Sequence, residues 1–214
     1  MITTTIGVLA LQGDFAAHAI AMERAGARTV EVRNATELTQ CDGLILPGGE
    51  STTMLRLLDS GNLFAPLREF GLAKPIYGTC AGAILLATSV SNPTQRSLQL
   101  MDIAVQRNAY GRQAESHIAR LRTDVVELDV VELDVTQLVV TELEAVFIRA
   151  PIIRQVGVNV RVLATHLGDP VWITEGMHMV TTFHPELTSD LVVHRHFLQM
   201  VRQAASVEQR MLVS

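Results

Sequence analysis

The strongest chemical signal in the sequence is a cysteine placed between two glycines. The run Gly78-Thr79-Cys80-Ala81-Gly82 follows an apolar stretch that should form a buried strand, Pro75 to Tyr77, and precedes an apolar helical stretch, Ala83 to Thr88. A nucleophile on a tight strand-to-helix turn needs small neighbours, since larger side chains would collide with the adjacent strand and helix. The partial positive charge of a helix N-terminus also favours the thiolate, the reactive form of cysteine. The pattern therefore predicts that Cys80 is a nucleophile and not merely a small buried side chain.

A cysteine nucleophile requires a base and a group that orients the base. Of the 7 histidines, His184 is the best candidate, because it ends the apolar stretch Met179 to Phe183 and is followed two residues later by Glu186. Two residues of extended chain place an imidazole and a carboxylate on the same side. Functional groups of α/β proteins gather at the carboxyl ends of strands, so we expect both side chains beside Cys80.

The other cysteine and the other histidines carry no comparable signal. Cys41 has no flanking glycines of this kind and is expected to pack, and two cysteines cannot build a disulfide framework or a cysteine-rich zinc site. We expect His194 and His196 on the surface of the last helix. Four histidines have no acid in a suggestive frame: His18, His117, His166 and His178. No His-Glu-x-x-His or similar spacing occurs, so neither a metal nor a cofactor is expected.

A glycine-rich loop, Pro47 to Thr52, joins an apolar strand to the start of a helix. The amides of Gly48 and Gly49 can point into a cleft beside Cys80 and stabilise a tetrahedral oxyanion. The alternative is a phosphate cradle at a helix N-terminus, which is less favoured because the loop lacks the Gly-Lys-Ser/Thr ending of a P-loop. The residues alone thus indicate a cysteine-dependent acyl-transfer hydrolase.

The elements that must position these residues alternate strand and helix in the N-terminal half. That alternation is typical of a parallel sheet with helices on its faces. Later strands follow one another closely, which predicts hairpins or a mixed extension of the sheet. We therefore expect a three-layer α/β fold, with a mostly parallel central sheet, helices on both faces and a mixed or antiparallel C-terminal extension. The expected strands are 6–11, 29–32, 43–46, 75–77, 146–149, 160–165, 171–174 and 178–183, and the expected helices start or lie at 15–25, 51, 83–88 and 191–204.

Composition limits the classes of protein that the chain can belong to. It has 214 residues, 48% hydrophobic against 18% charged, enough apolar surface for one folded domain over 1–214. A net charge of -5 with scattered basic residues argues against nucleic-acid binding. The longest uncharged stretch, Pro75 to Gln95, is interrupted by polar residues, glycine and proline, and the first residues lack a basic region. We expect a cytoplasmic protein without a membrane segment.

One segment has a period of its own. From Val125 the sequence repeats VVELD-like units every five residues, and 124–144 contains seven acidic residues and no basic one. A five-residue period fits neither a helix nor a strand. We expect a β-rich peripheral excursion with a solvated acidic face; an acidic docking surface is the alternative.

Taken together, the motifs resemble class I (triad-type) glutamine amidotransferases, and within them the glutaminase subunits of pyridoxal 5'-phosphate synthases. The Gly-x-Cys-x-Gly turn and His-Pro-Glu are typical of the whole superfamily, whereas four longer strings are narrower. The resemblance covers nearly the whole chain. It rests on 7–14 (GVLALQGD), 46–54 (LPGGESTTM), 78–82 (GTCAG), 107–113 (RNAYGRQ), 146–151 (VFIRAP) and 183–188 (FHPELT).

The resemblance implies a catalytic triad in which Cys80 is the nucleophile, His184 the general base and then acid, and Glu186 the orienting carboxylate. It implies that glutamine is held by Gly48, Gly49, Glu50, Arg107, Ile148 and Arg149. An arginine is also the natural partner of the substrate α-carboxylate, and an acid or a carbonyl of its α-ammonium. The implied reaction converts L-glutamine to L-glutamate and ammonia.

In that family the ammonia passes to a separate synthase subunit, which combines it with a pentose phosphate and a triose phosphate to make pyridoxal 5'-phosphate. The resemblance also implies that a partner aligns the oxyanion hole, and the Gly48-Gly49 loop is where we expect that switch. Two alternatives stay open: a glutaminase that serves a different acceptor synthase, and a non-catalytic interaction protein on the same fold.

Overall fold

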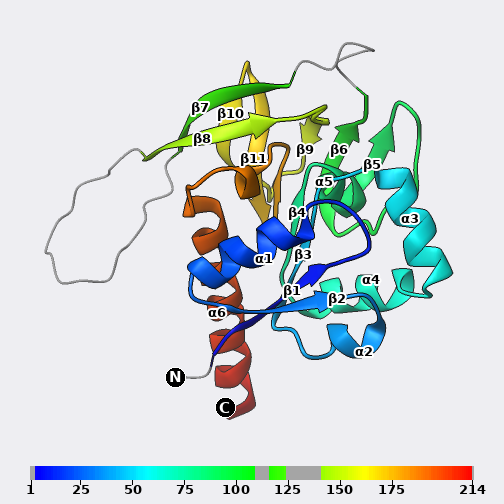
Figure 1. The fold of residues 1–214 in the computed structure, drawn as a ribbon, viewed down its shortest axis with the longest axis vertical. Coiled ribbons are helices and arrows are strands. Elements are labelled where there is room, and N and C mark those ends of the chain that lie inside the picture. Colours follow the sequence, from blue (N-terminus) through cyan, green and yellow to red (C-terminus); the bar gives the residue numbers. More distant parts are fainter. Residues whose placement is uncertain (1–2, 109–115, 124–140, 214) are drawn as a thin grey trace, which may run out of the picture.

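A seven-stranded sheet runs through the middle of the structure (Figure 1). In the computed structural model, which describes residues 3–108, 116–123 and 141–213, the strand order is β10-β11-β12-β4-β3-β1-β2. Strands β10 (Arg161–His166) and β11 (Asp169–Glu175) extend the sheet in antiparallel fashion from β12. The predicted mostly parallel sheet with an antiparallel C-terminal extension is confirmed. The parallel strands are β1 (Thr5–Leu9), β2 (Arg28–Val32), β3 (Gly43–Leu46), β4 (Ile76–Thr79) and β12 (His178–Thr181).

Helices cover both faces of this sheet, as predicted. Helices α1 (Phe15–Arg24) and α6 (Val192–Val213) lie on one face (Figure 1). The other face is packed by α3, α4 and α5, with the short α2 beside them. Strand β3 shows how the layers form, because Leu44 and Leu46 belong to one apolar cluster and Ile45 to the other. The bounds of these four helices are Ala35–Leu38 (α2), Ser51–Ser60 (α3), Phe64–Ala73 (α4) and Ala81–Leu86 (α5).

Two smaller sheets stand beside the carboxyl ends of the central strands, and the sequence patterns predicted only part of one of their strands, at 146–147. Strand β6 (Met101–Gln106) pairs in parallel with β5 (Ala87–Ser91) and antiparallel with β9 (Ile152–Val156). Strands β7 (His117–Thr123) and β8 (Thr141–Phe147) form an antiparallel pair. The alternation of buried and exposed residues along β6 is a usable signal, with Met101, Ile103 and Val105 all buried.

Several expected boundaries are wrong. The helix expected over 83–88 ends at Leu86, because residues from Ala87 onward pair with β6. The strand expected over 146–149 ends at Phe147, so Ile148 and Arg149 lie beyond it, and the last helix continues to Val213. The cap of α3 is Glu50, whose side chain accepts from the amides of Thr52 and Thr53.

The acidic repeat lies mostly outside the described residues, which resume at Thr141. Its end forms β8, where Glu142 and Glu144 are exposed on either side of the buried Leu143. Glu142 pairs with Arg122 of β7 at 3.3 Å. The single domain over 1–214 with a peripheral excursion stays a prediction. In the part of the chain that the structure describes, no helix is long and apolar enough to cross a membrane.

Acid should destabilise this fold through histidines that are buried without charge. Burial lowers the pKa of His178 to about 4, while its Nδ1 accepts from the amide of Ile76 at 3.2 Å. Since the unfolded chain binds this proton near pH 6.5, the stability contribution is full above that pH and is lost as the pH falls to about 4, on the order of 3 kcal/mol. His178→Asn keeps an acceptor but cannot titrate. Urea unfolding from pH 8 to 4 should show a shallower loss in the variant than in the wild type; equal slopes would contradict this.

Candidate active site

Cys80 occupies a sharp turn between β4 and α5, at the middle of the central sheet. Its backbone has φ 48° and ψ -99°, in the left-handed region that side chains rarely adopt, and its amide donates to the carbonyl of Thr181 at 2.9 Å. Both flanking glycines are required by close backbone approach. A Cβ on Gly78 would lie 2.5 Å from the carbonyl carbon of Gly82, and a Cβ on Gly82 would lie 2.1 Å from the carbonyl oxygen of Leu46.

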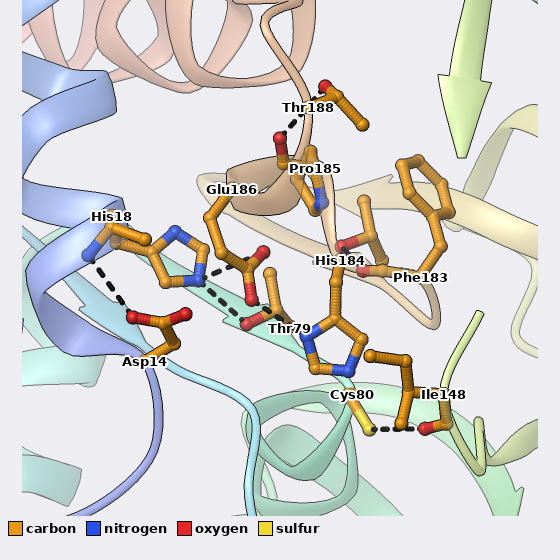
Figure 2. Close-up of polar contacts among 12 residues, drawn as sticks. Asp14, His18, Thr79, Cys80, Ile148, Phe183, His184, Pro185, Glu186 and Thr188 are labelled. Carbon is orange, nitrogen blue, oxygen red and sulfur yellow. Dashed lines mark hydrogen bonds and ion pairs between the residues drawn. The ribbon is translucent and has the colours of Figure 1, made fainter. Parts of the chain in front are cut away.

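His184 faces Cys80 from the segment after β12, and Glu186 lies on the other side of the imidazole (Figure 2). Glu186 lies in η1, a 3-10 helix of one turn (Pro185–Leu187), and its Oε1 is 2.7 Å from Nδ1 of His184. The backbone amide of His184 donates to the carbonyl of Val146 at 2.8 Å, so β8 helps to hold the imidazole. The structure thus brings together the three residues that the sequence predicted as a triad.

The charges within this group stabilise one another. Burial disfavours a charged imidazole, but the hydrogen bonds and charges of Cys80 and Glu186 outweigh it and raise the pKa of His184 to about 10. Burial also disfavours a charged carboxylate, yet His18 and then His184 hold the pKa of Glu186 well below its ordinary value. The arrangement therefore favours an imidazolium between an ionised carboxylate and the sulfur, which is the state that a thiolate nucleophile needs.

The Gly48-Gly49 loop packs between His184 and the loop that follows β1. A Cβ on Gly48 would lie 2.4 Å from Cε1 of His184, so only glycine fits against the imidazole. Gly49 has φ 138°, and Nε2 of Gln12 donates to the carbonyl of Glu50 at 2.7 Å. A Cβ on Gly13 would lie 1.9 Å from the carbonyl oxygen of Gly48. The sequence patterns assign no role to Gln12, although its Leu-Gln-Gly-Asp string after a strand is a signal.

Glu50 and Arg107, both expected to bind substrate, are bound to each other. A guanidinium nitrogen of Arg107 lies 3.2 Å from Oε1 of Glu50 and 2.9 Å from Oγ1 of Thr52. Burial works against ionisation of Glu50, but donors from Thr52 and Thr53 lower its pKa to about 2. Arg107 is buried, at 8% exposure, and its hydrogen bonds to Glu50 and Thr52 use the same guanidinium nitrogen.

A pocket of about 190 Å³ opens over Cys80. The carbonyl oxygen of Ile148 lies 4.0 Å from Sγ, and the next residue, Arg149, has φ 44°. Two of the predicted site residues do not line the pocket. Gly48 lies against the imidazole of His184, and Glu186 lies behind that imidazole. The sequence did not predict Ser51, Ile84, Asn108 and Pro151 in the wall. The lining comprises Gly49, Glu50, Ser51, Cys80, Ile84, Arg107, Asn108, Ile148, Arg149, Pro151 and His184.

Two expectations about histidines are wrong. His18 does have an acidic partner, since its Nε2 lies 3.3 Å from Oε2 of Glu186. His194 is not on the surface of the last helix but fully buried, with Nε2 3.1 Å from Nδ1 of His18. Among the described residues no group of three or more histidine, cysteine or acidic side chains could hold a metal ion.

Comparison with known proteins gives the family. The model of the SNO glutamine amidotransferase family matches residues 8–203. The chain belongs to this family. A curated relative from Solibacter usitatus, pyridoxal 5'-phosphate synthase subunit PdxT, is 56% identical over 90% of this chain and 97% of its own length. The subunit of the same name from Thermotoga maritima is 46% identical over 92% and 99%.

Solved structures agree with membership of the SNO glutamine amidotransferase family. One described as a glutamine amidotransferase superposes with a TM-score of 0.80 at 38% identity, covering 92% of this chain and 98% of that one. A putative GMP synthase component from Thermoplasma acidophilum has a TM-score of 0.66 at 16% identity, covering 98% and 99%, and shares the fold.

Proposed function

We propose that this chain hydrolyses L-glutamine to L-glutamate and ammonia at Cys80, and delivers the ammonia to a synthase subunit that makes pyridoxal 5'-phosphate. One observation carries the chemistry: Cys80 on its strained turn shares a pocket with His184, whose other ring nitrogen is 2.7 Å from a buried carboxylate. The names of the relatives support the pathway. A cytoplasmic location stays a prediction.

The triad supplies a complete acyl-transfer cycle. The thiolate of Cys80 attacks the side-chain amide carbon of glutamine, and the carbonyl oxygen becomes an oxyanion facing the amides of the glycine loop. The imidazolium of His184 then protonates the leaving nitrogen, ammonia departs, and a glutamyl thioester remains on Cys80. Neutral His184 next removes a proton from water as that water attacks the thioester carbon. The tetrahedral intermediate then expels the Cys80 thiolate, glutamate leaves, and the imidazolium–thiolate pair is restored. Glu186 keeps the imidazole in one orientation throughout.

The ends of the pocket fit the two charges of the glutamine backbone. Arg107 is a buried guanidinium suited to the α-carboxylate, and Arg149 adds a second cation to the lining of the pocket. The Ile148 carbonyl and the Glu50 carboxylate are acceptors for the α-ammonium group. Glu50 already caps α3 and holds Arg107. We therefore assign two roles to Glu50: it positions the guanidinium of Arg107, and it lines the pocket.

The substitution Arg107→Ala should weaken glutamine binding more than it slows the chemistry. Arg107 lines the pocket and contacts Glu50 and Thr52, and no proton or bond of the proposed cycle passes through it, so its loss removes binding common to ground and transition states. We expect KM for glutamine to rise by roughly 30- to 100-fold, the value of a charge-assisted hydrogen bond, with kcat changed far less. Arg68→Ala is the control, at an exposed arginine of α4 whose Nε donates to the carbonyl of Leu98 at 3.1 Å. A fall in kcat at constant KM would place Arg107 in the chemistry.

The decisive experiment measures ammonia release from glutamine by the purified chain, first alone and then with a pyridoxal 5'-phosphate synthase subunit. Strong release that depends on this subunit supports both the chemistry and the pathway. Equal release with and without it would keep the triad but detach it from pyridoxal 5'-phosphate. Absence of release in both cases would favour a different acceptor subunit or an idle site.

A further inference from the structure

Two buried histidines that the cycle above does not use continue the line of polar contacts behind Glu186. His18 comes from α1 and His194 from α6, and both have 0% exposure. Nε2 of His18 lies 3.3 Å from Oε2 of Glu186 and 3.1 Å from Oγ1 of Thr79, as Figure 2 shows. Nδ1 of His18 lies 3.1 Å from Nε2 of His194. The contacts therefore run from Cys80 through His184, Glu186 and His18 to His194.

The hydrogen-bond partners decide where the proton of His18 lies. The hydroxyl of Thr79 donates to the carbonyl of Leu46 at 3.4 Å, which leaves its lone pairs to accept from His18. Oε2 of Glu186 is buried and has no hydrogen-bond partner of good geometry among the described residues, so the Nε2 of His18 is the group that faces it. A proton on Nε2 serves both oxygens, whereas a bare nitrogen there would face a carboxylate lone pair.

His194 selects this tautomer. Burial lowers the pKa of His194 to about 3, so at neutral pH its ring carries one proton. Its Nδ1 is buried without a partner in the described part of the chain. A proton on Nδ1 would leave a buried N–H unpaired, which costs more than an unpaired acceptor. With its proton on Nε2 instead, His194 donates to Nδ1 of His18 and obliges His18 to carry its own proton on Nε2.

We propose that His18 is a positioning residue for the triad: held in one tautomer by His194, it binds the second oxygen of Glu186 and keeps that carboxylate ionised and turned toward His184. This proposal depends on the proposed function only for the identity of the substrate, glutamine. Three titratable groups face His18 among the described residues: Glu186 on η1, His194 on α6 and Tyr77 on β4. Tyr77 lies edge-on at 6.1 Å from the His18 ring, and its hydroxyl is engaged by Thr181 at 2.9 Å.

Alkylation of Cys80 by iodoacetamide, followed over pH by peptide mass, tests the proposal without glutamine or a partner. His18→Leu should lower the alkylation rate at pH 7 about tenfold, since it removes the polar contact at 3.3 Å to a charged carboxylate, and should shift the half-maximal rate to higher pH. His18→Gln offers an amide N–H at a similar reach and should restore the rate to within about threefold of wild type. Cys41 is the internal reference for an unreactive thiol in the same protein, because burial raises its pKa to about 11.

The matched control is His178→Leu. This variant also replaces a buried histidine with leucine, but His178 lies on β12, at the opposite end of that strand from Thr181. It should lose stability and leave the alkylation profile unchanged. The proposal is overturned if His18→Leu has the wild-type profile, or if His18→Gln fails as fully as His18→Leu, since the histidine would then be needed only for packing.

A second pair guards against loss of folding in His18→Leu. His194→Gln retains a donor toward His18 and should behave as wild type, whereas His194→Leu should show the same upward shift, and equal profiles for the two variants would count against the proposal. Ammonia release with the synthase subunit, measured on the same proteins, separates the two proposals. If alkylation depends on His18 while the wild type releases no ammonia, the glutamine assignment fails and the positioning role stands.

Discussion

Cys80→Ala should abolish glutamine-dependent ammonia release, with a loss on the order of 10⁴-fold or more, because no thioester can form without the sulfur. The variant keeps a Cβ on the same strained turn, so its stability should match that of wild type. Ammonia assays with the synthase subunit present, together with urea unfolding, check both statements. Retained activity would show that Cys80 is not the nucleophile.

Cys80→Gly separates strain from chemistry at the same position. Glycine adopts φ 48° without steric conflict, so this variant should be as inactive as Cys80→Ala yet more stable, by about 1 kcal/mol after the greater chain entropy of glycine is subtracted. Cys41→Ala, at the packed cysteine, is the control and should keep activity. Lower stability of the glycine variant relative to the alanine variant would mean that the turn stores no strain.

Glu186→Gln should reduce kcat by roughly 10³- to 10⁴-fold while KM changes little. The amide can present either its oxygen or its N–H₂ to Nδ1 of His184, and it carries no charge to support the imidazolium that protonates the leaving ammonia. Steady-state ammonia release with the synthase subunit, measured over a range of glutamine concentrations, gives both constants.

Glu142→Gln provides the matched control for this charge removal, because Glu142 is a glutamate of β8 that is exposed and paired with Arg122. It should leave kcat unchanged. A loss below tenfold in Glu186→Gln would show that the carboxylate neither orients nor charges His184, and would also remove the basis for the part assigned to His18.

Sequence patterns could predict that Cys80, His184 and Glu186 lie together because their signals are local. Glycine is needed on both sides of Cys80 in any chain that makes this turn. A Cβ on Gly78 would collide with Gly82, and a Cβ on Gly82 would collide with Leu46. His184 and Glu186 are two residues apart, so one short segment places both. The alternation of strands and helices likewise follows from nearby residues.

The missed features depend on contacts between residues far apart in the sequence. His18 and His194 are 176 positions apart in the sequence. No local pattern around either histidine predicts that the two contact each other or that His18 contacts Glu186. Strands β5 and β9 become visible only through their pairing with β6, and Ala87 leaves the predicted helix because β6 offers it a partner. Glu50 caps α3 because its long side chain reaches two backbone amides at once.

Strand β8 places two parts of the site with one backbone. The carbonyl of Val146 holds the amide of His184, and the carbonyl of Ile148, just past the strand end, faces the sulfur. A one-residue insertion inside β8 would turn its buried face outward and move both carbonyls. The length of β8 between Thr141 and Phe147 is therefore fixed by the chemistry at its end.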